Sequence, residues 1–338
     1  MADHNTVIVE PSSDACNAWD SFVDGSPQGC IFCKSWWLEA VCPGAYRFLL
    51  AEKGGRILGG MPLIETRKWG IRAIHMPRLT QTLGILLAPQ EEAKGCTRLS
   101  DELRVIRDLV AAIPPVHYFA VNFHPAFTNW LPLYWRGYQQ TTRYTYVIRT
   151  EVGPVALWDA LGKKTRKTIR KAEKQAITIR RLDDVDVFLD MNKKTFSRQG
   201  LRLPYSEQLV RRLTAVCMRR DAGRMHVARD PQGRIHCATY VVFDHKTMYA
   251  LMSGSDPELR ASGAHALAKW QSICMACDMG LSFDFEGSMI EDVERFNRGF
   301  GAHQVPYFHI SKIHPVLALG RDIARWLRQR RPVQDSQE

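Results

Sequence analysis

The chain has 338 residues, of which 45% are hydrophobic and 24% are charged, and its formal net charge is +11. These proportions exclude a disordered or fibrous protein, and the length allows two domains with buried cores. No apolar stretch approaches the roughly 18 residues that cross a bilayer. The first residues lack the basic end and apolar run of a signal peptide, so we expect a cytoplasmic protein. The positive charge predicts attraction to phosphates or anionic surfaces.

The first half of the chain predicts a small unit of strands and helices. Residues 46–64 have the pattern of a β-hairpin around the glycine-containing turn 53–56. Further apolar segments of strand or helix length follow it. In chain order they are a strand-like stretch at 74–87, a helix at 101–112, a short strand at 117–123 and a closing strand at 142–148.

The second half repeats this order. Gly55-Arg56-Ile57 in the first hairpin is echoed by Gly233-Arg234-Ile235. Arg136-Gly137-Tyr138, before the first closing strand, is echoed by Arg298-Gly299-Phe300. The predicted elements are a hairpin at 225–243, a strand at 247–253, a helix at 261–279, a strand at 281–286 and a closing strand at 306–310.

The two copies differ in length. The interval from Arg56 to Arg136 is 80 residues and that from Arg234 to Arg298 is 64, so the first copy has 16 additional residues, which we place within 66–83. Loops absorb such differences readily. We therefore predict two copies of one α+β unit. The first domain covers residues 1–150, the second covers 151–312, and a basic C-terminal helix or tail covers 313–338.

A basic segment opens the second copy. Residues 162–181 contain nine basic residues and one acid, Glu173. On a helix, Lys163, Lys167, Arg170 and Lys174 share one face, because intervals of three and four residues return to the same side. Bound phosphates would neutralise this face, and a solvated charged face is the alternative. The segment has no interleaved aromatic residues, which favours phosphate contact over base stacking.

Three stretches of the second half resemble a known family. They are LWDALGKKTRKTIRKAEKQAITI (157–179), YALMSGSDPELRASGAHAL (249–267) and LSFDFEGSMIEDVERFNRGFGA (281–302), the last followed by Tyr307. Together with the repeated element order, they resemble the Fem-type peptidyl and aminoacyl transferases, which pair two domains of the GNAT acyltransferase fold. The resemblance implies an α+β protein of two tandem GNAT-like domains, each a mixed, mostly antiparallel sheet flanked by helices.

The resemblance also implies an activity. An N-acyltransferase of this kind passes an aminoacyl or acyl group to an amine of a cell-envelope or related precursor, which is nucleotide- or lipid-linked. Its donor is aminoacyl-tRNA or acyl-coenzyme A, and no cofactor is tightly bound. One alternative is an acyl-coenzyme A dependent N-acyltransferase of polysaccharide or lipid assembly. Another is a non-catalytic RNA- or membrane-binding protein on the same fold.

The donor would bind where a helix begins. Arg260-Ala261-Ser262-Gly263-Ala264-His265 partly matches the GNAT pattern Gln/Arg-x-x-Gly-x-Gly/Ala, in which backbone N–H groups at a helix start hold the donor's pyrophosphate. The resemblance therefore implies donor binding by Ser253, Arg260 and Gly263. His265 departs from the pattern, and its bulk predicts obstruction of a pyrophosphate. A Ser262-capped helix start is the alternative.

Two carboxylates are the candidates for proton transfer. Asp284 and Glu286 are two residues apart, so in a strand their side chains point to the same side. Either one, with a raised pKa, would accept the proton of the attacking amine. The alternatives are a salt bridge to Arg295 or Arg298, or capping of the helix after the following turn, with water accepting the proton instead.

The resemblance supplies further site residues. It implies that Arg298 faces the donor or the oxyanion and that Tyr307 orients a carbonyl. Relatives often carry a lysine where Asn297 stands. Asparagine cannot take the role of that lysine, so Arg298 would have to substitute for it. In the basic segment, the positions implied to bind substrate phosphates are Arg166, Arg170 and Lys171.

We expect no metal site. The nine cysteines are an odd number, which predicts free thiols. The pairs Cys30/Cys33 and Cys274/Cys277 have zinc-ligand spacing, but the second pair falls within an apolar helical stretch where cysteine acts as a small hydrophobe. Isolated histidines such as His236 are expected to be structural. No HExxH zinc motif, G-x-S-x-G elbow or Walker A loop occurs in the sequence, which argues against a zinc peptidase, serine hydrolase or ATPase.

The C-terminal residues 315–331 predict a basic amphipathic helix. Leu319, Ile323, Trp326 and Leu327 lie on one side of such a helix, and Arg321, Arg325 and Arg328 lie on the other. It would dock either on its own domain or, peripherally, on the anionic inner face of a membrane.

Overall fold

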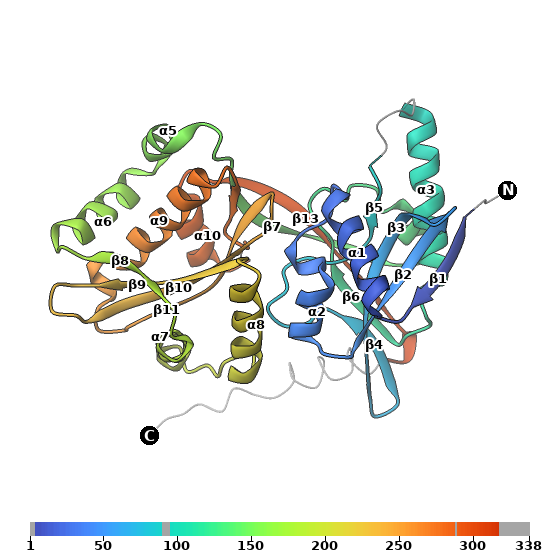
Figure 1. The fold of residues 1–338 in the computed structure, drawn as a ribbon, viewed down its shortest axis with the longest axis horizontal. Coiled ribbons are helices and arrows are strands. Elements are labelled where there is room, and N and C mark those ends of the chain that lie inside the picture. The colour runs from blue at the N-terminus through green and yellow to red at the C-terminus, as the bar shows by residue number, and fades with distance from the viewer. Residues whose placement is uncertain (1–3, 90–94, 288, 318–338) are drawn as a thin grey trace, which may run out of the picture.

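The computed structural model describes residues 4–89, 95–287 and 289–317. They form two lobes, and two long strands run from one lobe to the other (Figure 1). The first half of the chain contains β1 (Asn5–Val9), α1 (Ser13–Gly25), the 3-10 turn η1 (Ile31–Cys33), α2 (Ser35–Val41), β2 (Tyr46–Lys53), β3 (Arg56–Lys68), β4 (Ile71–His75), β5 (Leu86–Leu87), α3 (Gly95–Ala112), β6 (Tyr118–Asn122), α4 (Leu131–Trp135) and β7 (Gln139–Ile148).

The second half repeats this order with additional helices at its start. It contains α5 (Gly153–Ala160), α6 (Lys163–Lys174), β8 (Thr178–Leu182), α7 (Val185–Arg198), α8 (Glu207–Arg219), β9 (Gly223–Arg229), β10 (Ile235–Phe243), β11 (Thr247–Ser255), the 3-10 turn η2 (Arg260–Ser262), α9 (Ala264–Asp278), β12 (Ser282–Asp284), α10 (Glu291–Arg298) and β13 (His303–Ile313). In the second lobe α6 and α9 cover one face of the sheet, while α7 and α8 cover the other (Figure 1).

The predicted hairpins are confirmed, and their turns show why they form. Gly54 and Gly55, between β2 and β3, have φ of 58° and 76°, a region that glycine adopts without steric cost. The length difference between the copies overlaps the predicted range 66–83 only in part. Residues 76–94 connect β4 to α3, whereas only residues 256–263 connect β11 to α9. Most of the additional residues of the first copy therefore lie after β4, beyond residue 75.

One continuous sheet joins the lobes. Within the described ranges it has 13 strands in the order β1-β2-β3-β4-β6-β13-β7-β12-β11-β10-β9-β8, with β5 added to β3. Two pairs of neighbours, β4 with β6 and β11 with β12, are parallel and the other pairs are antiparallel. The predicted mixed, mostly antiparallel sheet flanked by helices is confirmed.

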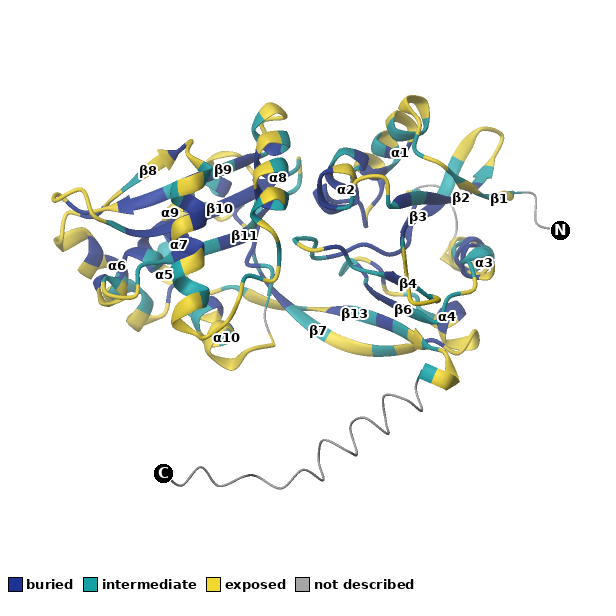
Figure 2. Ribbon diagram, turned by 90° about the horizontal axis from the view of Figure 1, so that it is seen from below, coloured by how far each residue is buried: buried dark blue, intermediate teal, exposed yellow. Residues whose placement is uncertain are grey.

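The closing strands of the two halves are exchanged. β7, which ends the first half, pairs with β12 of the second half. β13, which ends the second half, pairs with β6 of the first half. The two closing strands also pair with each other, from 139–147 to 303–311, and they cross between the lobes in Figure 2. Each half therefore depends on the other to complete its sheet.

Buried apolar side chains cross the junction as well. One cluster includes Trp19 and Trp37 of the first half and Leu213 and Tyr249 of the second. The rings of Phe32 and Tyr249 meet across the junction with their centroids 4.8 Å apart. A second cluster lies between α5, α6, α9 and the sheet of the second half. No helix in the described parts of the chain is long and apolar enough to cross a membrane.

Candidate functional site

The site begins where two parallel strands separate. β11 and β12 pair only over residues 247–249 and 282–284, although β11 continues to Ser255. Asp284 is the last paired residue of β12. In the first half the corresponding opening, between β4 and β6, is filled by the added segment, residues 76–89 of the connection between β4 and α3. Leu83 bridges to Phe123, and the Gln81 carbonyl oxygen accepts from Asn122 Nδ2 at 3.0 Å. In the second half the separation is lined by ionisable groups.

The turn after β12 is pressed onto the first half's closing strand. Glu286 has a φ of 61° and Gly287 a φ of 58°. A Cβ atom at Gly287 would lie 2.1 Å from the carbonyl oxygen of Tyr144 in β7. A left-handed backbone is costly for glutamate, and such outliers cluster at functional sites. The expectation that Glu286 continues the strand is wrong, because β12 ends at Asp284.

Asp284 is held by residues of the first half. Its carboxylate accepts hydrogen bonds from the Thr145 hydroxyl of β7 and, at 2.7 Å, from the Glu286 backbone N–H. Gln81 Nε2, from the added segment, donates to Thr145 Oγ1 at 3.2 Å. Burial raises the pKa of Asp284 to about 6, against the opposing effect of these hydrogen bonds. This carboxyl group therefore exchanges protons near neutral pH.

Glu286 and Lys269 form the rest of the ionisable group. Burial, and then the charge of Asp284, hold the pKa of Glu286 well above its usual range. Its Oε1 atom is buried and has no hydrogen-bond partner among the described residues. Lys269 of α9 is only 8% exposed, and its Nζ lies 5.9 Å and 5.8 Å from the ring centroids of Phe283 and Phe285. Burial lowers its pKa to about 8, although the charge of Glu286 opposes the shift.

Tyr307 joins this group and Arg298 does not. Tyr307 of β13 is 8% exposed, and burial raises the pKa of its hydroxyl, with the charges of Asp284 and Glu286 contributing. Arg298 lies on the exposed face of α10, where its Nε donates to Glu294 Oε1 at 2.8 Å. Arg295 pairs with Glu291 and Asp292. Neither arginine forms the salt bridge to the carboxylates that was considered as an alternative.

The predicted donor loop lies under α6. Gly263, with a φ of 85°, precedes the first residue of α9, and a Cβ atom there would lie 2.4 Å from the carbonyl oxygen of Thr168 in α6. Lys171 Nζ donates to the Ala261 carbonyl oxygen at 2.6 Å. Arg260 is exposed in η2 beside them. Ser253 lies on β11, beyond the separation, where its carbonyl oxygen accepts from Asn192 Nδ2 at 2.9 Å.

His265 is held by α10 rather than by the loop. Its ring stacks on Phe296 with the centroids 5.2 Å apart and an interplanar angle of 11°. Burial lowers its pKa to about 3, and Nε2 has no hydrogen-bond partner among the described residues. Asn297, next to Phe296, is 4% exposed and its Nδ2 is likewise unpartnered there. The position where relatives carry lysine is therefore buried.

A relay that sequence reasoning missed braces the loop. His236 Nδ1 lies 2.9 Å from Ser262 Oγ, and His236 Nε2 lies 3.1 Å from Asp230 Oδ2. Burial opposes ionisation of Asp230, but hydrogen bonds from His236 and Arg234 prevail and lower its pKa to about 2. The relay ties the β9–β10 turn to the start of α9. No local pattern links these residues, since His236 and Ser262 are 26 residues apart.

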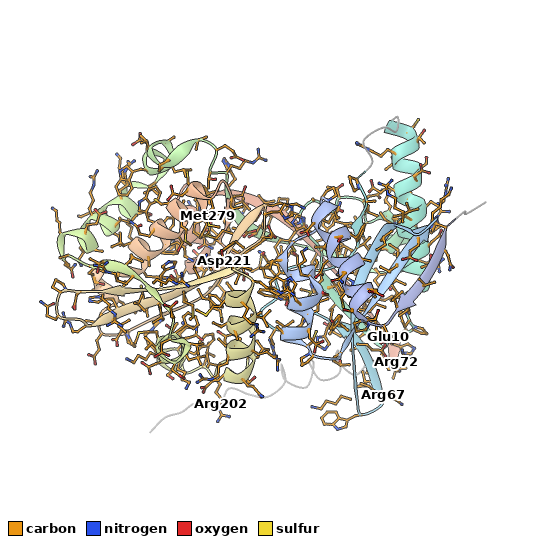
Figure 3. All side chains as sticks on the ribbon, in the orientation of Figure 1. Glu10, Arg67, Arg72, Arg202, Asp221 and Met279 are labelled. Atoms are coloured by element: carbon orange, nitrogen blue, oxygen red, sulfur yellow. The ribbon has the colours of Figure 1, made fainter. Side chains whose placement is uncertain are left out.

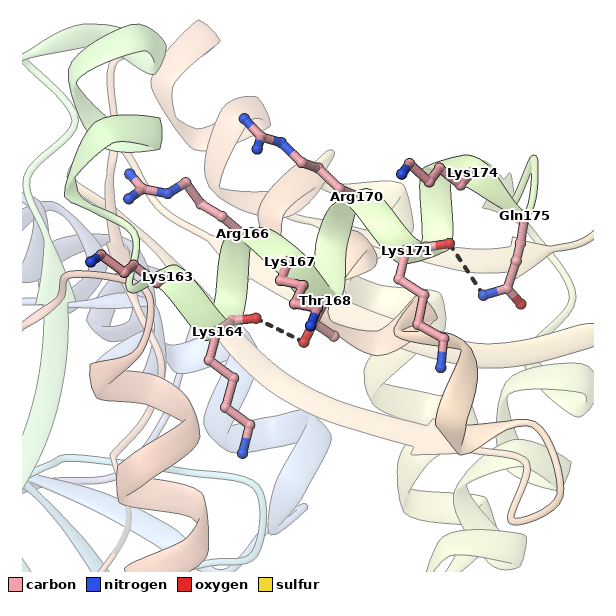
Figure 4. A pocket seen from close by; sticks show the side chains of 9 residues that line it. All are labelled: Lys163, Lys164, Arg166, Lys167, Thr168, Arg170, Lys171, Lys174 and Gln175. Carbon is pink, nitrogen blue, oxygen red and sulfur yellow. Dashed lines mark hydrogen bonds between the residues drawn. The ribbon is translucent and has the colours of Figure 1, made fainter.

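The basic face of α6 is exposed as a shallow groove between long side chains (Figure 4). Arg166 and Arg170 project on one side of the helix, and Lys164 and Lys171 on the other (Figure 4). The three predicted phosphate ligands also hold neighbouring elements. Arg166 Nη1 donates to the Asp159 carbonyl oxygen at 2.8 Å, Arg170 lies 5.7 Å from the Trp158 ring centroid, and Lys171 holds Ala261. Within the described residues no hydrogen bond or ion pair engages the side chains of Lys163, Lys164, Lys167 and Lys174.

Comparisons with known proteins agree with this architecture. The family model described as an acetyltransferase (GNAT) domain matches residues 163–295. The match begins at α6 and includes the donor loop, Lys269 and both carboxylates. No curated protein matches the sequence.

Solved structures extend the likeness to the whole chain. FemX superposes with a TM-score of 0.67 at 12% identity, covering 89% of this chain and 96% of FemX. A tandem GNAT protein from the clavulanic acid biosynthesis pathway gives 0.53 at 11%, covering 91% and 98%. The C-terminal domain of a protein assigned as a lysylphosphatidylglycerol synthetase from Agrobacterium fabrum gives 0.56 at 10%, covering 93% and 97%. The chain therefore has a tandem GNAT fold of the kind found in FemX, and residues 163–295 of its second half match the acetyltransferase (GNAT) domain model.

Proposed function

We propose that this chain is an N-acyltransferase that passes an acyl or aminoacyl group to a primary amine, with Asp284, Glu286 and Lys269 as its reaction centre. The observation that supports this most is the pair of carboxyl groups with raised pKa where β11 and β12 separate, beside a buried lysine. Burying ionisable groups costs stability. Groups with strongly shifted pKa values therefore cluster where a reaction uses them.

The carboxylate pair supplies the base. An amine attacks only after it loses the proton of its ammonium form, and a carboxylate with a pKa near 6 accepts that proton better than an ordinary one. The nitrogen then bonds to the donor's carbonyl carbon. The bond from that carbon to the sulfur or oxygen of the leaving group breaks, and the leaving group takes up the second proton, which the nitrogen loses as the amide forms. The carboxyl group returns the first proton to water.

Lys269 and Tyr307 stabilise the charge that forms. As the nitrogen bonds, the carbonyl oxygen becomes negative and needs donors that are already in place. The ammonium of Lys269, present below about pH 8, and the buried hydroxyl of Tyr307 are such donors. This assignment replaces Arg298, which is engaged by Glu294 on the surface.

The donor would lie along α9. Ser262, Gly263 and Ala264 are buried beneath α6. The donor's phosphate would therefore be held by the exposed cations beside this helix start, those of α6 and Arg260. At a rise of 1.5 Å per residue, Lys269 is about 9 Å further along α9 than Gly263. A donor whose phosphate rests near Gly263 and α6 would thus extend toward the carboxylates. Acyl-coenzyme A and aminoacyl-tRNA both have this order of groups.

The acceptor we propose is an amine of a nucleotide- or lipid-linked cell-envelope precursor. The fold likeness to FemX and to a protein assigned as a lysylphosphatidylglycerol synthetase supports aminoacyl transfer. The likeness to a tandem GNAT protein supports acyl-coenzyme A as the second donor candidate. The competing function is RNA or membrane binding without catalysis. It does not explain why two carboxyl groups and Lys269 are buried together.

The test is a transfer assay read by mass spectrometry. The full chain is incubated with acyl-coenzyme A or aminoacyl-tRNA and a panel of amines, and products are identified by their added mass. We expect Glu286→Gln and Asp284→Asn to lower turnover by roughly 100-fold or more. Glu258→Gln, an exposed glutamate near the donor loop, is the matched control and should retain activity. Turnover in Glu286→Gln and Asp284→Asn equal to that of the parent would refute the assigned centre, and RNA binding without turnover would support the non-catalytic function.

A further inference from the structure

The most exposed large apolar side chain is at the tip of the β3–β4 hairpin. Among the described residues, the exposed fraction of Trp69 is 88%, above that of every other large hydrophobic side chain. Trp69 has a φ of 51° and Gly70 a φ of 76°. Such two-residue turns ordinarily carry asparagine or glycine first, and a bulky residue with left-handed backbone is an outlier. A tryptophan that is exposed to solvent and held in a strained turn contributes little to the core, so it indicates contact with a partner molecule.

The tip stands clear of the sheet. Residues 65–68 of β3 pair only with 71–74 of β4, and β4 meets β6 only from Ala73 onward. The end of the hairpin is therefore a free two-stranded ribbon, which projects from the first lobe where Arg67 and Arg72 are labelled in Figure 3.

The tip is also cationic. Arg67 and Lys68 are exposed, and Lys68 Nζ lies 4.5 Å from the Trp69 ring centroid. Arg67 and Arg72 are opposite each other in the register, an arrangement of like charges that destabilises a hairpin. Glu65 neutralises Arg72 through a contact of 2.6 Å, while no ion pair of Arg67 occurs among the described residues. An anionic partner would relieve this repulsion.

The described chain ends next to the base of the same hairpin. Ile313 of β13 pairs with Tyr118, the His314 N–H donates to the His117 carbonyl oxygen at 2.8 Å, and the His117 N–H donates to the Arg72 carbonyl oxygen at 2.9 Å. The sequence after Leu317 contains Arg321, Arg325, Arg328, Arg330 and Arg331 together with Trp326. The described chain thus ends beside the basic, tryptophan-bearing hairpin, and most of the C-terminal helix predicted at 315–331 lies outside the described residues.

We propose that the tip of the β3–β4 hairpin docks on an anionic lipid bilayer, with Trp69 at the headgroup level and Arg67 and Lys68 against lipid phosphates. Tryptophan favours the membrane–water interface because its ring is apolar and its N–H is polar. Lysine and arginine are attracted to anionic lipid surfaces. Single-stranded RNA also binds aromatic and basic side chains, but in grooves that carry successive stacking platforms, whereas this tip presents one exposed aromatic ring on a two-stranded ribbon. The proposal does not depend on the acyl transfer.

The test is co-sedimentation of the full chain with vesicles. We expect binding to vesicles of mixed phosphatidylglycerol and phosphatidylcholine, and much weaker binding to phosphatidylcholine alone or in high salt. Trp69→Asn should reduce vesicle binding at least tenfold. It also creates Asn-Gly, the favoured sequence of this turn, so the melting temperature should stay equal or rise. Arg67→Gln with Lys68→Gln should weaken binding and its salt dependence.

Val155→Ala is the matched control, since Val155 is 77% exposed on α5, which lies on the opposite side of the molecule from the β3–β4 hairpin in Figure 1. It should bind vesicles as the parent does. Undiminished vesicle binding by Trp69→Asn would overturn the proposal, as would equal binding to neutral and anionic vesicles. Loss of single-stranded RNA binding in Trp69→Asn with vesicle binding intact would assign the tip to RNA instead.

Discussion

Thr145, on the closing strand of the first half, donates a hydrogen bond to the carboxylate of Asp284, which ends the last parallel strand of the second half. The two residues are 139 positions apart in the chain. They meet because β7 is exchanged into the sheet of the second half, where Val147 is paired with Asp284. The candidate reaction centre is therefore assembled from both copies.

Replacing Thr145 by valine should move the pH dependence of activity upward. The hydroxyl stabilises the ionised form of Asp284 and so lowers a pKa that burial raises to about 6. Losing a hydrogen bond to a buried charge costs about 1 to 3 kcal/mol, equivalent to a rise of roughly one to two pKa units. The acidic limb of kcat/KM against pH should shift to higher pH accordingly. Thr141→Val, an exposed threonine on the same strand, should leave the profile in place.

Lys269→Met should separate activity from stability. The pKa of Lys269 is lowered from 10.5 to about 8, so between these values the unfolded chain binds more protons than the folded one and stability rises with pH. The rise amounts to about 3 kcal/mol. We expect the free energy of unfolding of Lys269→Met to lack this rise and turnover to fall at least ~100-fold. Lys193→Met, at an exposed surface pair, is the control. If the free energy of unfolding of the parent protein does not change between pH 8 and 10.5, the lowered pKa of Lys269 is contradicted.

Gly287→Ala should be far more damaging than Gly54→Ala. Both glycines have a φ of 58°, but a Cβ atom at Gly287 meets the Tyr144 carbonyl oxygen at 2.1 Å while one at Gly54 meets nothing within 4 Å. The backbone cost alone is about 1 kcal/mol, and the clash should add several kcal/mol more. Urea denaturation of the two variants measures the difference. A similar loss of unfolding free energy in both variants would show that the turn at Gly287 can move away from β7 without cost.

The basic face of α6 is best tested through its unpartnered lysines. Changing Lys163, Lys164, Lys167 and Lys174 to glutamine should lower donor binding, and the slope of log K against log salt should fall by about 3 if the donor is single-stranded RNA. The melting temperature should be unchanged. Replacement of Arg166, Arg170 and Lys171 should weaken binding and also stability, because these three hold α5 and η2. Equal salt slopes in the parent and the lysine variant would exclude phosphate contacts on this face.

Residues 4–150 expressed alone should be poorly soluble. β13 pairs with both β6 and β7. Without it, one edge of each of these strands has no hydrogen-bonding partner, and exposed strand edges promote aggregation. Co-expression with residues 151–317 should restore a soluble complex. A cooperative melting transition of 4–150 by itself would contradict the need for strand exchange.

Much of the local structure follows from the sequence alone. The Gly54-Gly55 turn requires positive φ and so predicts the β2–β3 hairpin, and the repeated order of elements predicts two copies of one unit. The charge spacing of α6 and the carboxylates Asp284 and Glu286 are also visible in the sequence. Lys269 could have been noticed too, as the one lysine or arginine in a largely apolar helix. These features depend on neighbours within a few residues, where turn chemistry and helical periodicity act directly.

The tertiary structure decided which residues share a site. Strand exchange brings Gln81 and Thr145 to Asp284, and the end of β12 at Asp284 puts Glu286 in a strained turn against β7. Arg298 is drawn to Glu294 one helical turn away instead of to the carboxylates, while the Asp230–His236–Ser262 relay joins a hairpin turn to the start of α9. Each of these depends on burial and on pairing between distant segments. Whether a carboxyl or an ammonium has a shifted pKa is set by how far the assembled fold excludes water, which local sequence does not encode.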